Sequence, residues 1–137
     1  MSADWAAQRT EAARVQGERL AARKNAEHVK AEALIAQHFP LIQQKGPAPV
    51  PLVVQGYGGI GSARTNLTGW YLRHNRTVAL GTDGKFYVLT APLSLKDRIT
   101  GVRPQPTRPP LIIGEGGKDG ESVPLEEALK RVYLGQG

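Results

Sequence analysis

The sequence of 137 residues contains no cysteine, and its longer apolar runs, such as residues 111–113, span only a few positions. The first absence excludes disulfide scaffolds and cysteine-based zinc sites. The second excludes a membrane helix, which needs roughly 20 apolar residues. The N-terminal stretch mixes acidic and basic side chains and has no apolar core of a signal peptide. We therefore expect a soluble, cytoplasmic protein that makes no membrane contact.

Motifs for catalysis and for cofactors are also missing. Gly56-x-Gly58-x-x-Gly61 matches the dinucleotide fingerprint, but only residues 62–68 separate it from the next strand pattern. That interval is too short for the helix on which a pyrophosphate rests. The segment is instead typical of a loop between strands, or of a backbone nest that holds an anion with the help of Arg64. We expect no cofactor for this loop.

Other candidate sites fail on spacing. The glycine-rich loop 114–120 lacks the Walker A pattern, and its neighbouring acids fit no EF-hand. The three histidines are far apart in the sequence, and no serine lies in a nucleophile elbow. We assign no catalytic residue and no metal ligand. An enzyme is the least favoured of three interpretations.

Proline is absent from residues 3–38, which contain one glycine, Gly17, and are rich in strong helix formers. This predicts one long helix, or two with a break at Gly17. Its apolar positions follow a seven-residue spacing, but most are alanine, which buries little area. Larger apolar residues begin only at Leu34, so we expect the helix to dock by its C-terminal third and to project or pair by the rest.

Three prolines within residues 46–51 form a stiff boundary, beyond which the pattern becomes that of strands. We divide the chain into a helical arm (1–45), a proline-rich boundary (46–51) and an α+β domain (52–137) that folds without the arm. The domain is predicted as an antiparallel meander of four to six strands, with its tightest hairpin turn at Thr82-Asp83-Gly84. A final helix from Pro124 to Gly135 packs on the sheet. The fold class is α+β.

Charge is concentrated in the middle of the chain. Segment 62–110 contains eight basic and two acidic residues, in a protein whose net charge is +6. Such a segment attracts polyanions, although it also fits an ordinary solvated surface. Aromatic residues between the arginines suggest base stacking, with core packing as the alternative. The candidate nucleic-acid contacts are Arg64, Tyr71, Arg73, Arg76 and Arg98.

The favoured interpretation is a non-catalytic binding or adaptor module that contacts other proteins through the N-terminal helix and the sheet surface. Trp5, Val15 and Val29 are the candidate protein contacts, because tryptophan is enriched at binding hot spots and small neighbours permit close helix approach. The partner is either another protein or a second copy of this chain. The alternative is a basic protein associated with nucleic acid, RNA or DNA, through segment 62–110. A third pattern, Arg103-x-x-Pro106-x-x-Pro109, resembles a polyproline ligand but also fits a crossover between strands.

Overall fold

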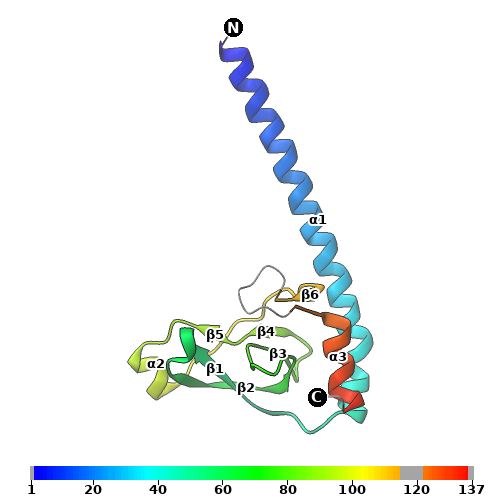
Figure 1. The fold of residues 1–137 in the computed structure, drawn as a ribbon, viewed down its shortest axis with the longest axis vertical. Coiled ribbons are helices and arrows are strands. Elements are labelled where there is room, and N and C mark those ends of the chain that lie inside the picture. The colour runs from blue at the N-terminus through cyan, green and yellow to red at the C-terminus, as the bar shows by residue number, and fades with distance from the viewer. Residues whose placement is uncertain (1, 115–121, 136–137) are drawn as a thin grey trace.

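Helix α1 (Ser2–Lys45) is continuous through both Gly17 and Pro40 in the computed structural model, which describes residues 2–114 and 122–135. Of the two sequence predictions, one long helix is correct. A single glycine costs a helix only about 1 kcal/mol, and the surrounding alanine, glutamate and arginine residues outweigh it. At about 1.5 Å per residue the helix is roughly 66 Å long, and its N-terminal half stands clear of the body of the protein (Figure 1).

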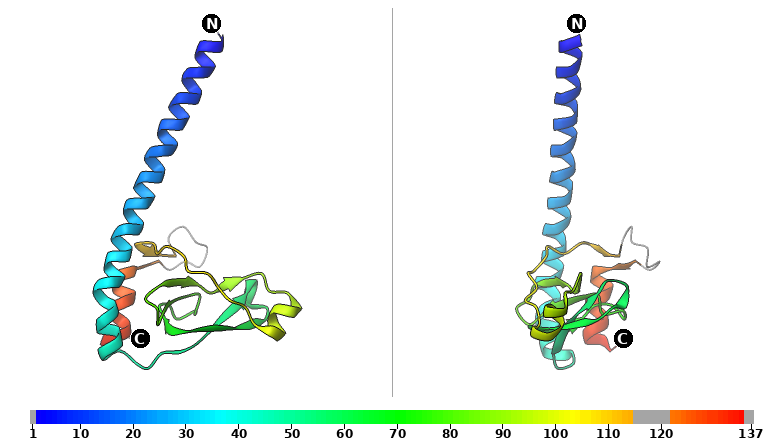
Figure 2. Two further views of the ribbon diagram at one scale, coloured as in Figure 1. Left: turned by 180° about the vertical axis from the view of Figure 1, so that it is seen from behind. Right: turned by 90° about the vertical axis from the view of Figure 1, so that its left-hand side faces the viewer.

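The C-terminal third of α1 docks on the body, as the sequence predicts. Ala31, Ile35, His38 and Ile42 are buried, and they recur at the spacing of one helix face. They pack against helix α3 (Leu125–Leu134), whose buried residues are Leu125, Ala128 and Leu129. The two helices lie side by side in both views of Figure 2.

The contact between α1 and α3 includes one buried polar pair. His38 Nδ1 lies 2.9 Å from the hydroxyl of Tyr133, and the two rings stack with their centroids 5.8 Å apart. Among the described residues, His38 Nε2 is the buried side-chain polar atom without a hydrogen-bond partner. This pair orients α3 along α1.

The sheet has five strands in the order β4-β3-β2-β1-β5 and confirms the α+β class. Its strands are β1 (Val50–Gly56), β2 (Ser62–Tyr71), β3 (Val78–Gly81), β4 (Phe86–Val88) and β5 (Thr90–Ala91). The first four pair antiparallel with their neighbours, and β2, β3 and β4 form the predicted meander. Strand β5 instead pairs parallel with β1, so the sheet is mixed and the expectation of a purely antiparallel meander is wrong.

The physical reason for the parallel pair is that one short segment serves both edges of the sheet. Only Leu89 separates β4 at one edge from β5 at the other. Its N–H donates to Thr77 O over 2.7 Å, and its carbonyl accepts from Gln55 N over 2.9 Å. The sheet therefore curls until its edges approach each other at this fully buried leucine.

Alternation along the strands separates two apolar clusters, one on each face. Trp70 and Leu72 belong to the cluster beneath α1 and α3, together with Val78, Leu80 and Phe86. Tyr87 and Leu89 belong to the other, which Leu93 and Val102 help to cover. The indole N–H of Trp70 donates to Pro47 O over 2.7 Å. The first face therefore holds the C-terminal third of α1 against the sheet, and the Trp70 hydrogen bond ties the proline-rich boundary to β2.

The hairpin turn at Thr82-Asp83-Gly84 forms as predicted, with Gly84 at φ 78°. Asp83 organises it, because one carboxylate oxygen accepts from Lys85 N and the other from the hydroxyl of Tyr87. Burial, and then the hydrogen bond to Asp83, raise the pKa of Tyr87 from 10.0 to about 12.

We expect this tyrosine to make the fold sensitive to alkali. Because the pKa of Tyr87 is raised on folding, its stabilisation is complete below pH 10 and is lost as the pH rises to about 12. The loss is on the order of 2 kcal/mol. Unfolding free energies measured from pH 8 to 12 should fall less for Tyr87→Phe than for the natural protein. Equal slopes would contradict the assignment.

The rest of the chain covers the sheet. Helix α2 (Leu95–Thr100) begins with a capping box between Ser94 and Asp97. Strands β6 (Ile112–Ile113) and β7 (Val123–Pro124) form a small second sheet before α3, and a 3-10 turn, η1 (Tyr57–Gly59), joins β1 to β2. The glycine-rich loop expected at 114–120 lies, apart from Gly114, outside the described residues.

Candidate binding surfaces

The N-terminal half of α1 is the most exposed element. From Asp4 to Ala26 every side chain is exposed except that of Val15, which its helical neighbours cover in part. Trp5 is 62% exposed, with the Arg9 guanidinium 4.7 Å above its ring centroid. We name residues 4–26 the arm. Two of the three predicted protein contacts, Trp5 and Val15, lie on it.

The third predicted contact, Val29, is 52% exposed although the helix is docked at this level. The reason is helical phase. Counting 100° per residue, Val29 points about 150° away from the mean direction of the buried residues 31, 35, 38 and 42. In Figures 1 and 2 the body lies on one side of α1 and the other side is open. By the same count Val15 points about 170° away from that direction and Trp5 about 90° away, so all three lie outside the docked side of α1.

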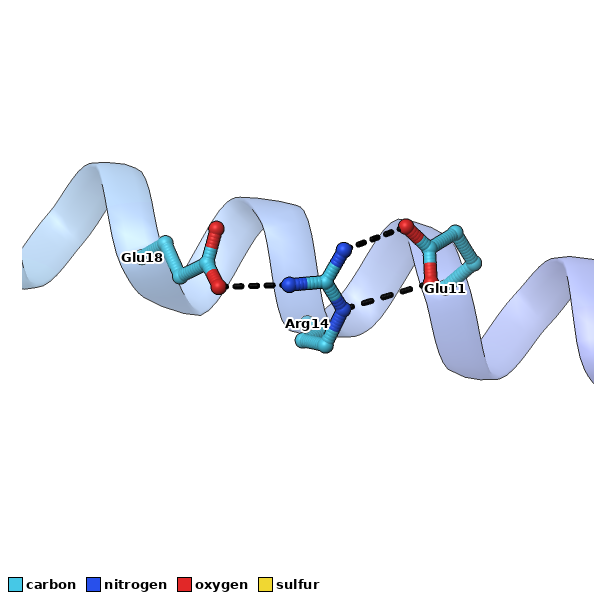
Figure 3. A network of polar contacts seen from close by, with 3 residues as sticks. All are labelled: Glu11, Arg14 and Glu18. Carbon is cyan, nitrogen blue, oxygen red and sulfur yellow. Dashed lines mark hydrogen bonds and ion pairs between the residues drawn. The ribbon is translucent and has the colours of Figure 1, made fainter.

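Charged pairs stabilise the arm along its side. Arg14 binds the carboxylates of Glu11 and Glu18, which lie one turn to either side of it (Figure 3). Exposed pairs at these spacings stabilise a helix by only about 0.3–0.5 kcal/mol each. They keep the arm helical at its surface without supplying a core.

The proline-rich segment 103–110 braces the base of the arm. Arg108 donates to Asn25 over 2.8 Å and to Glu32 over 2.9 Å. His28 Nδ1 lies 2.8 Å from the carbonyl of Pro109, which is itself buried. The crossover interpretation therefore fits this segment, because its side chains and carbonyls already contact α1. Spacing in the sequence carried no signal of these contacts.

Three of the five predicted nucleic-acid contacts meet at one hollow of about 310 Å³. Tyr71, Arg73 and Arg76 line it, and the Arg76 guanidinium lies 5.6 Å from the Tyr71 ring centroid. The structure adds His74 and, from α3, Arg131, which also pairs with Glu127 over 2.9 Å. We name this group the basic hollow. Arg131 was not predicted, because only the packing of α3 brings it to the β2–β3 turn.

The other two predicted contacts, Arg64 and Arg98, lie at a different place. Arg98 belongs to α2 and lies against Gly61, and Arg64 lies beside α2 with its Nη2 3.4 Å from Ile99 O. The five predicted contacts therefore lie in two groups, one near each end of β2. Tyr71 is also half-buried, and its hydroxyl accepts from Val53 N over 3.0 Å, so that edge of the ring is engaged by the fold.

The loop from Gly56 to Gly61 is a turn between two antiparallel strands. Gly58, Gly59 and Gly61 have positive φ, and Gly56 N donates to Gly61 O over 3.0 Å. Strand β2 follows the loop, as predicted, so the helix that a dinucleotide fingerprint requires does not follow it. The arginine beside the glycines is Arg98 rather than the expected Arg64.

Comparisons with known proteins add no relative: no family model, no curated protein and no solved structure matches the chain. In the described part of the chain, no group of three or more histidine, aspartate or glutamate side chains is arranged to hold a metal ion. Among the described helices, none is long and apolar enough to span a bilayer.

Proposed function

We propose that this protein is a non-catalytic binding module that contacts another macromolecule through the arm and the open face of α1. One observation carries the proposal: Trp5 and Val29 are 62% and 52% exposed, and neither points to the docked side of α1. Tryptophan is among the residues most enriched at binding hot spots. The cytoplasmic location stays a prediction from the sequence.

The energetics of an isolated helix support the same conclusion. Most helical stability in proteins comes from packing of an apolar face. The arm extends beyond the docked third of α1 without packing on the body, so it lacks this contribution, and Gly17 weakens it by about 1 kcal/mol. A partner that buries the open face would supply the missing packing.

The test is capture of partners from the native cell extract with a paired set of variants. The double variant Trp5→Ala with Val15→Glu removes the exposed indole ring and places a negative charge on the open face. Leu20→Ala with Ala21→Glu makes equivalent changes on another side of the same exposed helix. We expect the first variant to lose roughly thirtyfold in captured partner, as for hot-spot residues, and the control to lose little.

Nuclease treatment of the extract completes the experiment. Capture that survives nuclease and depends on Trp5 and Val15 supports the proposal. Equal capture by both variants would contradict it, because the open face would then contribute nothing. As a control, circular dichroism of each variant checks that the two have the same helix content.

A second candidate function is association with RNA or DNA, and the basic hollow favours it. Arg73 and Arg76 from the β2–β3 turn and Arg131 from α3 converge there around a concave surface. Clustered cations of this kind bind phosphates by releasing counterions, so the binding would weaken steeply with salt. The same capture experiment separates the two functions. Loss of all partners on nuclease treatment would favour the nucleic-acid candidate over the adaptor.

A further inference from the structure

The open face of α1 has the seven-residue repeat of a coiled coil. In heptad notation two rows form its seam, and the flanking rows lie on either side of it. The a row comprises Trp5, Ala12, Arg19 and Ala26, and the d row comprises Gln8, Val15, Ala22 and Val29. All eight side chains are exposed or, for Val15, half-buried. The seam is therefore accessible along its whole length.

The flanking rows carry opposite charges. On one flank, the e positions are Arg9, Gln16, Arg23 and Lys30. On the other flank, the g positions are Asp4, Glu11, Glu18 and Asn25. The e row contains no acidic residue and the g row contains no basic residue. A helix with such flanks presents a positive edge and a negative edge to anything that docks on its seam.

This arrangement is complementary to itself in one direction only. When two identical helices pair parallel, each g residue faces the e residue of the partner's next heptad, so Asp4 faces Arg9 and Glu18 faces Arg23. Both ion pairs occur twice by symmetry. When the helices pair antiparallel, g faces g and e faces e, which opposes like charges. We propose that the arm pairs with a second copy of this chain as a parallel two-stranded coiled coil over residues 4–30.

Arg19, the charged residue in the seam, is consistent with this pairing. A single basic residue at an a position is tolerated in two-stranded coiled coils and helps to set register and strand number. Its long side chain can reach the negative g flank of the other helix, where Glu18 lies at the same level. Arg14 contacts Oε1 of Glu18 within its own helix, and a carboxylate accepts bonds at both oxygens. Glu18 can therefore serve both arginines.

The body of the protein leaves room for the second helix. The docked residues of α1 lie on the side opposite the seam, so two bodies would flank the coiled coil without sharing its space (Figure 2). Arg108 limits the pairing at the C-terminal end of the seam, because it already binds Asn25 and Glu32 on the negative flank. We therefore place the end of the coiled coil near Lys30. This inference rests on the proposed function and names the partner.

Cysteine cross-linking tests both pairing and orientation, because the chain has no cysteine of its own. In a parallel, in-register dimer each seam residue meets its own copy. Ala12→Cys and Ala22→Cys should therefore both form disulfide-linked dimers in mild oxidant. Ala13→Cys and Ala21→Cys, one residue away on the same exposed helix, are matched controls and should cross-link at least tenfold less.

Charge exchange tests the flanks in the same protein. Glu18→Arg places like charges opposite Arg23 and should weaken the dimer roughly tenfold in sedimentation equilibrium. Adding Arg23→Glu to this variant reverses both partners and should restore the affinity. A merely structural effect of position 18 would not be rescued by the second change.

The natural protein should sediment with twice its monomer mass of 14.8 kDa at high concentration. A monomeric mass, together with no difference between seam and control cysteines, would overturn the second-copy inference. Cross-linking at only one of positions 12 and 22 would overturn the parallel orientation. Neither result decides the capture experiment. That experiment contradicts the proposed function only when the open-face variant captures as much partner as its control.

Discussion

A fragment of residues 46–137 is expected to lose cooperative folding, whereas a fragment of residues 27–137 is expected to keep it. The shorter fragment removes Ala31, Ile35 and Ile42, which are 0–6% exposed in the cluster beneath the helices. Replacing one buried isoleucine by alanine costs about 2–5 kcal/mol. Deleting the whole docked face therefore costs about as much as the 5–15 kcal/mol that hold a small domain together.

The longer fragment is the matched control for this experiment. It removes only residues 1–26, of which the described side chains from Asp4 onward are almost entirely exposed. We expect dispersed amide signals and a sharp thermal transition for residues 27–137, and broad signals with exposed apolar surface for residues 46–137. Native dispersion in the shorter fragment would show that α1 rests on a core that is already complete. The sequence-based expectation that residues 46–137 fold without the helix of residues 1–45 predicts that opposite result.

Substitution of Gly69 by alanine is expected to destabilise the protein by about 3 kcal/mol or more. Gly69 lies in β2 opposite Gly81, and a methyl group there would lie 2.1 Å from the carbonyl oxygen of Leu80. That oxygen belongs to the backbone of a buried strand, so neither partner can move without breaking the ladder between β2 and β3. Overpacking of this kind costs about 1–3 kcal/mol in ordinary cores and more where backbone must shift.

The same substitution at Gly17 should have the opposite sign. A methyl group at Gly17 meets no atom within 4 Å, and alanine is favoured over glycine in a helix by about 1 kcal/mol. Urea unfolding measures Gly69→Ala directly, and the helix content of the arm by circular dichroism measures Gly17→Ala. An unchanged midpoint for Gly69→Ala would mean that β2 and β3 do not approach as closely as described.

Several features of this fold follow from local patterns in the sequence. Helix formers without proline specify α1, the Thr82-Asp83-Gly84 turn specifies the hairpin, and the apolar spacing after Pro124 specifies α3. Each is decided within a few neighbouring residues, because backbone preferences and periodicity act locally. The seven-residue spacing of the arm belongs to the same class.

Other features depend on contacts between distant segments and left no local trace. The parallel pairing of β5 with β1 depends on the curl of the whole sheet around Leu89. The separation of Arg64 from Tyr71 depends on the length of β2; Arg98 lies near Arg64 because α2 packs beside β2, and Arg73 and Arg76 lie in the turn after Tyr71. Arg131 reaches the basic hollow only because α3 packs beside α1.

By itself the sequence determined the elements, the fold class, and the places of Trp5, Val15 and Val29 in the seven-residue repeat of one helix, since helical phase follows from residue number alone. Only the tertiary structure decided which face of α1 stays open. Burial of Ala31, Ile35 and Ile42 against the sheet and α3 removes one side of the helix from solvent and leaves the other accessible. That choice depends on the apolar area available on the body, a property of strands and helices assembled from the whole chain.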